Sequence, residues 1–154
     1  MLSEDIFKHF EIKTLRFYQI KMDMNISYSI VGSSVDPSIF GPAMWFTFHN
    51  GAVQYPNRPT EFIKHGMKQF LLNVPIMIPC ISCREHFYTL LSHTDLDQVV
   101  SSREALFKFW VDAHNYVNKR YGKPVISLRD AKDLYGFNDP STGSFIRIKY
   151  NAMK

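Results

Sequence analysis

Apolar residues recur at helical spacing through most of this 154-residue chain, and this periodicity is the feature that most limits its fold. Trp45, Phe48 and Ala52 follow one another at steps of three and four, which places them on one face of a helix. Thr60 and Glu61 carry the signal for the start of a second helix. The stretch between the two helices contains two prolines, which separate them.

Three further helices are predicted in the second half of the chain. One begins at a pair of cysteines, Ser101 and Glu104 form a capping box for a long amphipathic helix, and Ser127 caps a short one. Gly122 and Gly136 are expected to end the last two helices. The pattern therefore predicts a mainly α fold with a bundle of four to five helices.

Prolines are predicted to interrupt the helices at two places. A turn or short helix is expected to begin at Asp36 and Pro37, and the first long helix is expected to follow Gly41 and Pro42. Pro75 and Pro79 predict an extended approach to the cysteines, because a residue that precedes proline is pushed out of the helical conformation.

Two segments near the ends alternate between apolar and polar residues, strictly so in the first, which is typical of strands with one buried face. They are residues 20–30 and 144–150, and we expect them to pair, within the chain or across a dimer. The chain is accordingly divided into an N-terminal extension with a strand (1–35), a helical bundle (36–136) and a C-terminal tail with a short strand (137–154).

Composition excludes several classes of protein. With 45% hydrophobic and 21% charged residues, the chain is not of the disordered kind. Its longest apolar stretch, around residues 74–81, is broken by prolines and falls far short of the roughly 20 residues of a membrane span. Acids near the N-terminus argue against a secretory signal. The net charge of +4 comes from bases scattered among acids, so we expect no nucleic-acid partner.

The chain has two cysteines, Cys80 and Cys83, in the order Cys-Ile-Ser-Cys. A disulfide that closes so short a loop stabilises a fold little, so the pair is expected to have a chemical role. At a helix start, free backbone N–H groups and the positive end of the helix dipole favour a thiolate.

Four interpretations of the cysteine pair require different surroundings. A c-type haem needs His directly after the second cysteine, where this chain has Arg84, so haem is excluded. A thioredoxin-like site needs βαβ context, whereas the flanks here are helical. Zinc could be held by Cys80, Cys83, His86 and another histidine, although no second paired ligand motif exists. A redox disulfide that faces a cofactor within a helical bundle is the interpretation we favour.

Polar side chains on otherwise apolar helices indicate a buried ligand. His114 and Asn118 are one turn apart on the long helix, with Asn115 beside them, and Trp45 and His49 are one turn apart on the first helix. Burying such groups is costly unless they meet polar partners. A ligand with a flat ring and many acceptors would satisfy them.

Four motifs, taken in order, resemble those of the FAD-linked sulfhydryl oxidases of the Erv/ALR family. They cover roughly residues 38 to 135. The motifs are Gly41-x-x-x-Trp45-x-x-x-His49, Tyr55-Pro56-x-x-Pro59-Thr60, Cys80-x-x-Cys83-x-x-His86-Phe87, and His114-Asn115-x-Val117-Asn118 with Gly122-Lys123-Pro124.

The resemblance implies a four-helix bundle plus a short fifth helix that holds FAD, and it implies no metal. Cys83 is implied as the sulfur that faces the flavin, and Cys80 as the sulfur that a substrate thiolate attacks. Electrons would pass to dioxygen and give hydrogen peroxide. The implied partners are a thiol-containing protein substrate or a redox relay protein, and a second copy in a homodimer. The residues implied at the FAD are Gly41, Trp45, His49, Tyr55, His114, Asn115, Val117, Asn118 and Lys123.

The chain also departs from many cellular relatives. It lacks a shuttle cysteine pair, and Leu128 stands where a further disulfide occurs. Phe109 stands where relatives usually have Trp, with Trp110 shifted by one. These features resemble the compact forms of large DNA viruses, which implies a location in the host cytoplasm or virion, with the mitochondrial intermembrane space as the alternative. The opposing functional hypothesis is a noncatalytic, zinc-stabilised interaction module, and a basic nucleic-acid-binding bundle is a third.

Overall fold

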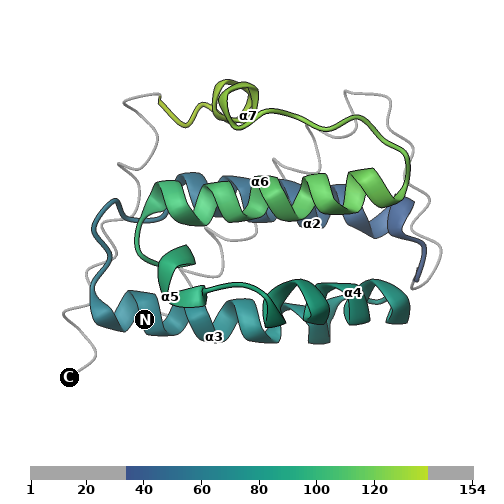
Figure 1. The fold of residues 1–154 in the computed structure, drawn as a ribbon, viewed down its shortest axis with the longest axis horizontal. Helices are drawn as coiled ribbons and strands as arrows, with labels where there is room; N and C mark the ends of the chain where they lie inside the picture. Colours follow the sequence, from purple (N-terminus) through teal and green to yellow (C-terminus); the bar gives the residue numbers. More distant parts are fainter. Residues whose placement is uncertain (1–33, 139–154) are drawn as a thin grey trace, which may run out of the picture. The chain divides into compact units, whose positions relative to one another are not determined.

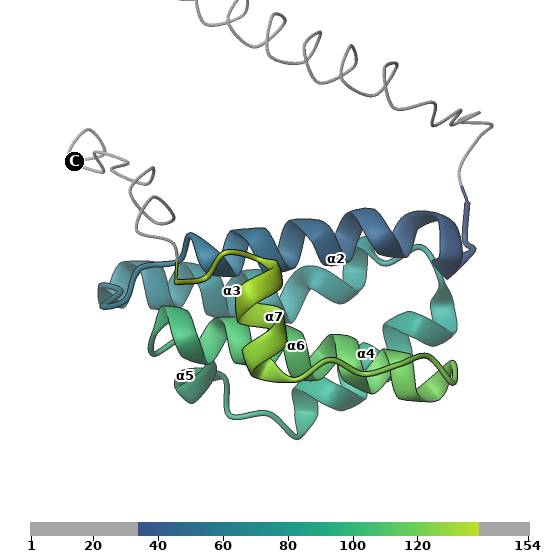
Figure 2. The ribbon, with the colours of Figure 1, turned by 90° about the horizontal axis from the view of Figure 1, so that it is seen from above.

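The structure of this chain is a computed structural model that describes residues 34–138. Its helices are α2 (Pro37–Val53), α3 (Glu61–Met77), α4 (Ile81–Ser92), α5 (Leu96–Val99), α6 (Arg103–Arg120) and α7 (Leu128–Leu134). In Figure 1, α2 and α6 lie side by side in one layer, and α3 and α4 form the other. Figure 2 shows that α7 crosses over α6, and the short α5 contacts both α3 and α6.

The described part of the chain is all-helical and contains no strand. This confirms the prediction of a mainly α fold for residues 34–138. The two predicted strands, at residues 20–30 and 144–150, lie outside the described residues. Within residues 34–138, no helix combines the length and the apolar character that crossing a membrane requires.

Side-chain caps start two helices where the sequence predicts them. The Thr60 hydroxyl accepts a hydrogen bond from the backbone N–H of Ile63 at 3.4 Å, at the start of α3. The Ser127 hydroxyl accepts one from the N–H of Asp130 at 3.1 Å, at the start of α7. Each cap satisfies a donor that the helix itself leaves unpaired, so these boundaries are fixed locally.

The predicted break at Gly41 and Pro42 was wrong, because both residues lie inside α2. The helix begins earlier, at Pro37, where the Asp36 carboxylate accepts from the N–H of Ser38 at 2.8 Å. Proline suits the first position of a helix, where its missing N–H would be unpaired in any case. The hydrogen bond from the Ser38 backbone lowers the pKa of Asp36.

The predicted extended approach from Pro75 was also wrong, because α3 continues to Met77 and only Ile78 and Pro79 separate it from the cysteines. The predicted capping box is one residue off as well. The cap of α6 is Ser102, whose hydroxyl accepts from the N–H of Ala105 at 3.2 Å. Ser101 instead donates to the carbonyl of Gln98 at 2.7 Å, just beyond α5, a helix that the sequence analysis did not predict.

The core forms where α6 meets the other helices. Phe107 and Trp110 on α6, Leu71 on α3 and Val53 on α2 are almost fully buried. Phe109 is buried beside Trp110, so this exchange of aromatic positions is accommodated within the core. Burying each such side chain contributes about 1.5–3 kcal/mol, and this packing holds α2 and α6 together.

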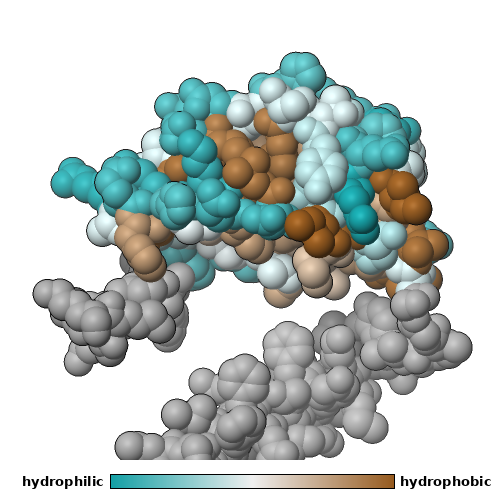
Figure 3. All heavy atoms as spheres, turned by 90° about the horizontal axis from the view of Figure 1, so that it is seen from below, coloured by the Kyte–Doolittle hydropathy of each residue, from teal (hydrophilic) through white to brown (hydrophobic). Residues whose placement is uncertain are grey.

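Some large apolar side chains of α3 and α4 stay in contact with solvent. Figure 3 views the molecule from the side of these helices and shows apolar groups among hydrophilic ones. The exposed apolar residues on these two helices include Phe62, Phe70, Leu72, Ile76, Met77 and Ile81.

Candidate functional site

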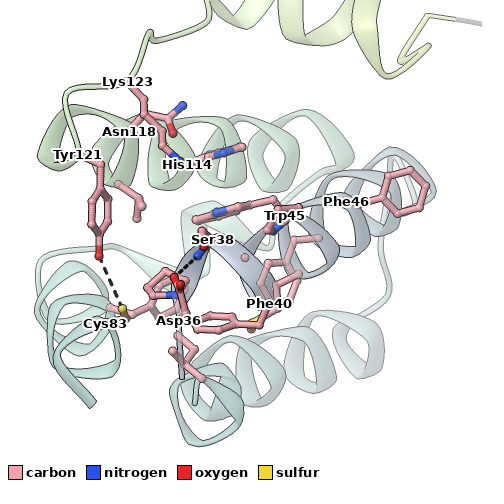
Figure 4. Close-up of a pocket in the computed structure, with 18 of the residues that line it drawn as sticks. Asp36, Ser38, Phe40, Trp45, Phe46, Cys83, His114, Asn118, Tyr121 and Lys123 are labelled. Atoms are coloured by element: carbon pink, nitrogen blue, oxygen red, sulfur yellow. Dashed lines mark hydrogen bonds between the residues drawn. The ribbon is translucent and has the colours of Figure 1, made fainter. Parts of the chain in front are cut away.

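A cavity of about 760 Å³ lies between α2, the end of α6 and the first turns of α4 (Figure 4). Helix α2 lines it with residues between 37 and 48, and α6 with residues between 114 and 118. Phe87 of α4 and Tyr135, just after α7, also contribute to its wall. Its size falls within the roughly 300–1,000 Å³ of small-molecule and cofactor sites.

The cysteine pair forms a disulfide at the start of α4, with one sulfur at the cavity. Cys80 is the N-cap of α4, and its sulfur accepts a hydrogen bond from the backbone N–H of Cys83 at 3.2 Å. Ser82 Oγ lies 3.4 Å from the same sulfur. Cys83 lines the cavity, whereas Cys80 does not. The two sulfurs therefore have different surroundings.

Stacked rings form one wall of the cavity. The Trp45 indole lies on the His114 imidazole, with centroids 4.3 Å apart and planes 6° from parallel. His49 lies beside this stack, with its Nε2 3.1 Å from His114 Nδ1, and Tyr135 stacks on His49 at 4.6 Å. Helices α2 and α6 thus bring together residues that are far apart in the sequence.

Burial keeps the two histidines uncharged at neutral pH. It lowers the pKa of His49 to about 4, and the neighbouring His114 adds to this effect. Burial also lowers the pKa of His114, with a further contribution from the charge of Lys123. One nitrogen of the His49–His114 pair must donate and the other accept, because both rings are neutral. The wall is therefore flat and uncharged.

The polar end of the cavity is formed where α6 ends. Lys123 lines the cavity next to Asn118, and its backbone N–H donates to the Asn118 carbonyl at 2.8 Å. Gly122 has a φ of 63°, a conformation that favours glycine and that turns the chain here. The Asn118 side chain donates to the carbonyl of Pro124 at 3.1 Å. A Lys side chain in this position offers a positive charge to a phosphate group.

Six of the nine residues predicted at the cofactor line the cavity. Gly41 is buried, and a Cβ built there would meet nothing within 4 Å, so α2 leaves open space at this point. The six are Gly41, Trp45, His114, Val117, Asn118 and Lys123.

The other three predicted residues are not among those that line the cavity. His49 pairs with His114, as described above. The Tyr55 hydroxyl donates to the carbonyl of Val100 at 3.0 Å, and burial raises the pKa of Tyr55 to about 12. Asn115 holds the backbone of Ile126 through two hydrogen bonds of 2.8 and 3.0 Å. None of the three lines the cavity, and each makes a hydrogen bond to another part of the fold.

Several lining residues were missed by the sequence analysis. Tyr121 lies with its hydroxyl 4.0 Å from Cys83 Sγ, as the dashed line in Figure 4 marks. Asp36 and Ser38 line the cavity at the start of α2, and Tyr135 lines it beyond α7. A start signal for α2 was available in the Asp36-Pro37 pair, but the sequence carried no signal for the approach of Tyr121 to α4.

The zinc interpretation lacks a ligand set in the part of the chain that the structure describes. There, no three His, Cys, Asp or Glu side chains gather in a way that could hold a metal ion. In the disulfide, moreover, the two sulfurs bond to each other and are not thiolate ligands. His86, which that interpretation requires, is not part of the cavity lining.

Comparisons with known proteins agree with this geometry. The model of the Erv1/Alr family matches residues 42–136. Protein 088R of Frog virus 3 is 38% identical over 119 residues, which cover 75% of this chain and 78% of that protein. The FAD-linked sulfhydryl oxidase of African swine fever virus is 34% identical over 97 residues, covering 62% of this chain and 79% of the relative.

The fold agrees as well. The crystal structure of the yeast Erv1 core superposes with a TM-score of 0.63 at 31% identity, covering 71% of this chain and 90% of that one. The resemblance inferred from four sequence motifs is thereby confirmed. With a family model that matches most of the helical part, and a solved member of the same fold, this chain belongs to the Erv1/Alr family.

Proposed function

We propose that this chain forms disulfides in protein substrates, with Cys80 as the attacked sulfur and Cys83 as the sulfur that hands electrons to FAD. As a member of the Erv1/Alr family, the chain is an FAD-linked sulfhydryl oxidase. The observation that carries the proposed roles is that Cys83 lines a cavity walled by the Trp45–His114 stack, whereas Cys80 does not.

The residues present fit FAD. The cavity offers a flat, uncharged ring stack for an aromatic ring, open space at Gly41, and the Lys123 ammonium for a phosphate. The side chains of Asn118 and His114 also bring polar atoms to the cavity lining. When bound, FAD supplies the acceptor for the two electrons that dithiol oxidation releases.

The chain's own sulfurs carry the exchange with substrate. A substrate thiolate attacks Cys80 Sγ and forms a mixed disulfide, the Cys80–Cys83 bond breaks, and its electron pair stays on Cys83 as a thiolate. A second substrate thiolate then attacks the substrate sulfur of the mixed disulfide. The substrate disulfide forms and Cys80 leaves as a thiolate. Two electrons now reside on the cysteine pair, next to the cavity.

The surroundings of Cys80 suit this role. Cys80 is outside the cavity lining and only half-buried, which leaves a protein thiol room to approach it. The backbone N–H of Cys83 already points at the Cys80 sulfur, at 3.2 Å. The same donor stabilises Cys80 when it leaves as a thiolate, because hydrogen bonds to charged acceptors are stronger than those to neutral ones.

Two single substitutions test the assignment of roles. In Cys80→Ser, the Cys83 thiolate should still perturb the visible flavin spectrum while turnover is abolished. In Cys83→Ser, both the perturbation and turnover should be lost. Identical spectra for the two variants would mean that neither sulfur is specifically placed at the flavin.

We also propose that dioxygen is the terminal electron acceptor and is reduced to hydrogen peroxide. A second proposal is that the chain forms a homodimer. Exposed apolar side chains on α3, among them Phe62, Phe70 and Ile76, support an association between copies (Figure 3). Sedimentation at several protein concentrations checks this, and a monomer throughout would contradict it. We propose the host cytoplasm or the virion as the location, which would follow from a viral origin of this chain.

A further inference from the structure

We propose that the Tyr121 hydroxyl is the hydrogen-bond donor that stabilises Cys83 as the leaving thiolate when substrate opens the disulfide. The proposal rests on the proposed function, since it assigns a residue to the same reaction. Its basis is the approach of Tyr121 Oη to Cys83 Sγ at 4.0 Å, between two residues that both line the cavity (Figure 4).

The backbone of Tyr121 is fixed by the end of α6. Its N–H donates to the carbonyls of Val117 and Asn118 at 3.2 and 3.1 Å. The N–H of Gly122 donates to Lys119 at 3.2 Å and that of Lys123 to Asn118 at 2.8 Å, the pattern of a Schellman motif. This motif sets the direction in which the Tyr121 side chain leaves the helix. In Figure 4 the ring extends from α6 towards the start of α4.

The sulfurs of Cys80 and Cys83 have separate hydrogen-bond donors. The first turn of α4 directs the N–H of Cys83 to the Cys80 sulfur, and Ser82 Oγ lies 3.4 Å from that same atom. Cys83 is already inside the helix, and its sulfur is approached by Tyr121 from a different element. Because a disulfide sulfur carries no hydrogen, the phenol must be the donor in this contact. The N-terminal end of α4 thus provides the hydrogen-bond donor for Cys80, and Tyr121 provides the donor for Cys83.

The hydrogen bond from Tyr121 to Cys83 becomes stronger when the disulfide opens. Attack of a substrate thiolate on Cys80 forms one S–S bond and breaks another, and the electron pair of the broken bond passes to Cys83. A thiolate is a far better acceptor than a disulfide sulfur because it carries the full charge, so the Tyr121 hydrogen bond strengthens at this step. A stabilised leaving thiolate departs faster in thiol–disulfide exchange. No proton is transferred, since Tyr121 keeps its hydrogen.

The test isolates Cys83 in the FAD-loaded Cys80→Ser variant, where it is the single cysteine left in the chain. The thiolate is titrated through its effect on the visible flavin spectrum, with and without Tyr121→Phe, which removes the hydroxyl and keeps the ring. We expect the midpoint to rise by about one pH unit, a tenfold change in the thiolate equilibrium, or about 1.4 kcal/mol. With Cys80 present, Tyr121→Phe should also slow anaerobic reduction by dithiothreitol.

The Tyr121→Phe substitution leaves the other ionisable groups near the cavity in place. Asp36, His114, Lys123 and Tyr135 line the same cavity, and Arg84 and His86 follow Cys83 on α4. None of them is changed by Tyr121→Phe, so a shift between the two titrations reports the missing hydroxyl.

Two further variants separate the donor from other effects. Tyr88→Phe is the matched control, because Tyr88 is on α4, similarly exposed, and absent from the cavity lining; it should leave the midpoint unmoved. Tyr121→Leu removes ring and hydroxyl together and should shift the midpoint as far as Tyr121→Phe does. A shift in Tyr121→Leu but not in Tyr121→Phe would overturn the proposal, because shielding by the ring would then be the cause.

Failure of the proposal and failure of the proposed function can be told apart. If the flavin spectrum of Cys80→Ser does not respond to pH at all, Cys83 is not at the flavin and the proposed roles fail. Alkylation of the same thiol by iodoacetamide as a function of pH then supplies the titration. Equal alkylation midpoints with Tyr121 and with Phe would overturn the role of Tyr121.

Discussion

Because of the buried histidine pair, we expect the FAD-free protein to lose stability in mild acid. His49 is 2% exposed, its Nε2 is bound to His114, and its Nδ1 has no hydrogen-bond partner in the described structure. Its pKa falls from the ordinary value of 6.5 to about 4 because burial disfavours the imidazolium. The unfolded chain therefore binds more protons than the folded chain between these two values.

The sign and size of the effect follow from this difference. The stabilisation is fully present above pH 6.5 and is lost as the pH falls towards about 4. Between pH 7 and pH 5, protonation of His49 in the unfolded state lowers the free energy of unfolding by about 2 kcal/mol, at 1.36 kcal/mol per unit of pKa difference. His114 acts in the same direction, since its pKa is lowered too.

Urea unfolding of the FAD-free protein between pH 5 and pH 7 measures this contribution. The free energy of unfolding of the wild type should fall more steeply towards pH 5 than that of His49→Gln. Gln can still bond to His114 but does not titrate. Acidic groups titrate alike in both proteins and cancel in the difference. If the difference in free energy of unfolding between the two proteins does not change with pH, His49 does not have a lowered pKa in the folded protein.

Two further predictions concern the surroundings of the cavity. Tyr55→Phe removes the buried hydrogen bond to the Val100 carbonyl and should lower the free energy of unfolding by about 1–3 kcal/mol, measured by urea unfolding, with little change in FAD content; an unchanged stability would contradict the role of this bond. His114→Ala removes half of the stack with Trp45 and should weaken FAD binding more than it destabilises the FAD-free protein. Equal losses of stability with and without FAD would mean that His114 is purely structural.

Local features of this fold could be predicted from the sequence. The caps at Thr60 and Ser127 depend on a hydroxyl and a backbone N–H three residues later, so a few neighbouring residues determine them. His114 and Asn118 were singled out because their spacing puts two polar groups on one face of an otherwise apolar helix, and the family resemblance placed them with Trp45 at the cofactor. All three line the cavity.

Features that depend on packing between distant elements could not be predicted in this way. Pro42 and Pro75 were interpreted as breaks, yet both lie inside helices, α2 and α3. Each removes one backbone hydrogen bond from its helix, and whether the rest of the fold offsets that cost cannot be read from neighbouring residues. The approach of Tyr121 to Cys83 and the pairing of His49 with His114 depend on how α6 lies against α4 and α2. Nothing in the residues next to them in the sequence reveals these contacts.

The proposed function is tested most directly by anaerobic mixing of the oxidised, FAD-loaded protein with dithiothreitol, followed through the visible flavin absorbance. We expect a yellow protein whose flavin bleaches in the wild type, bleaches far more slowly in Cys83→Ser, and recovers when air is admitted, with release of hydrogen peroxide. A colourless protein that contains stoichiometric zinc, or a flavin that bleaches equally fast without Cys83, would contradict it.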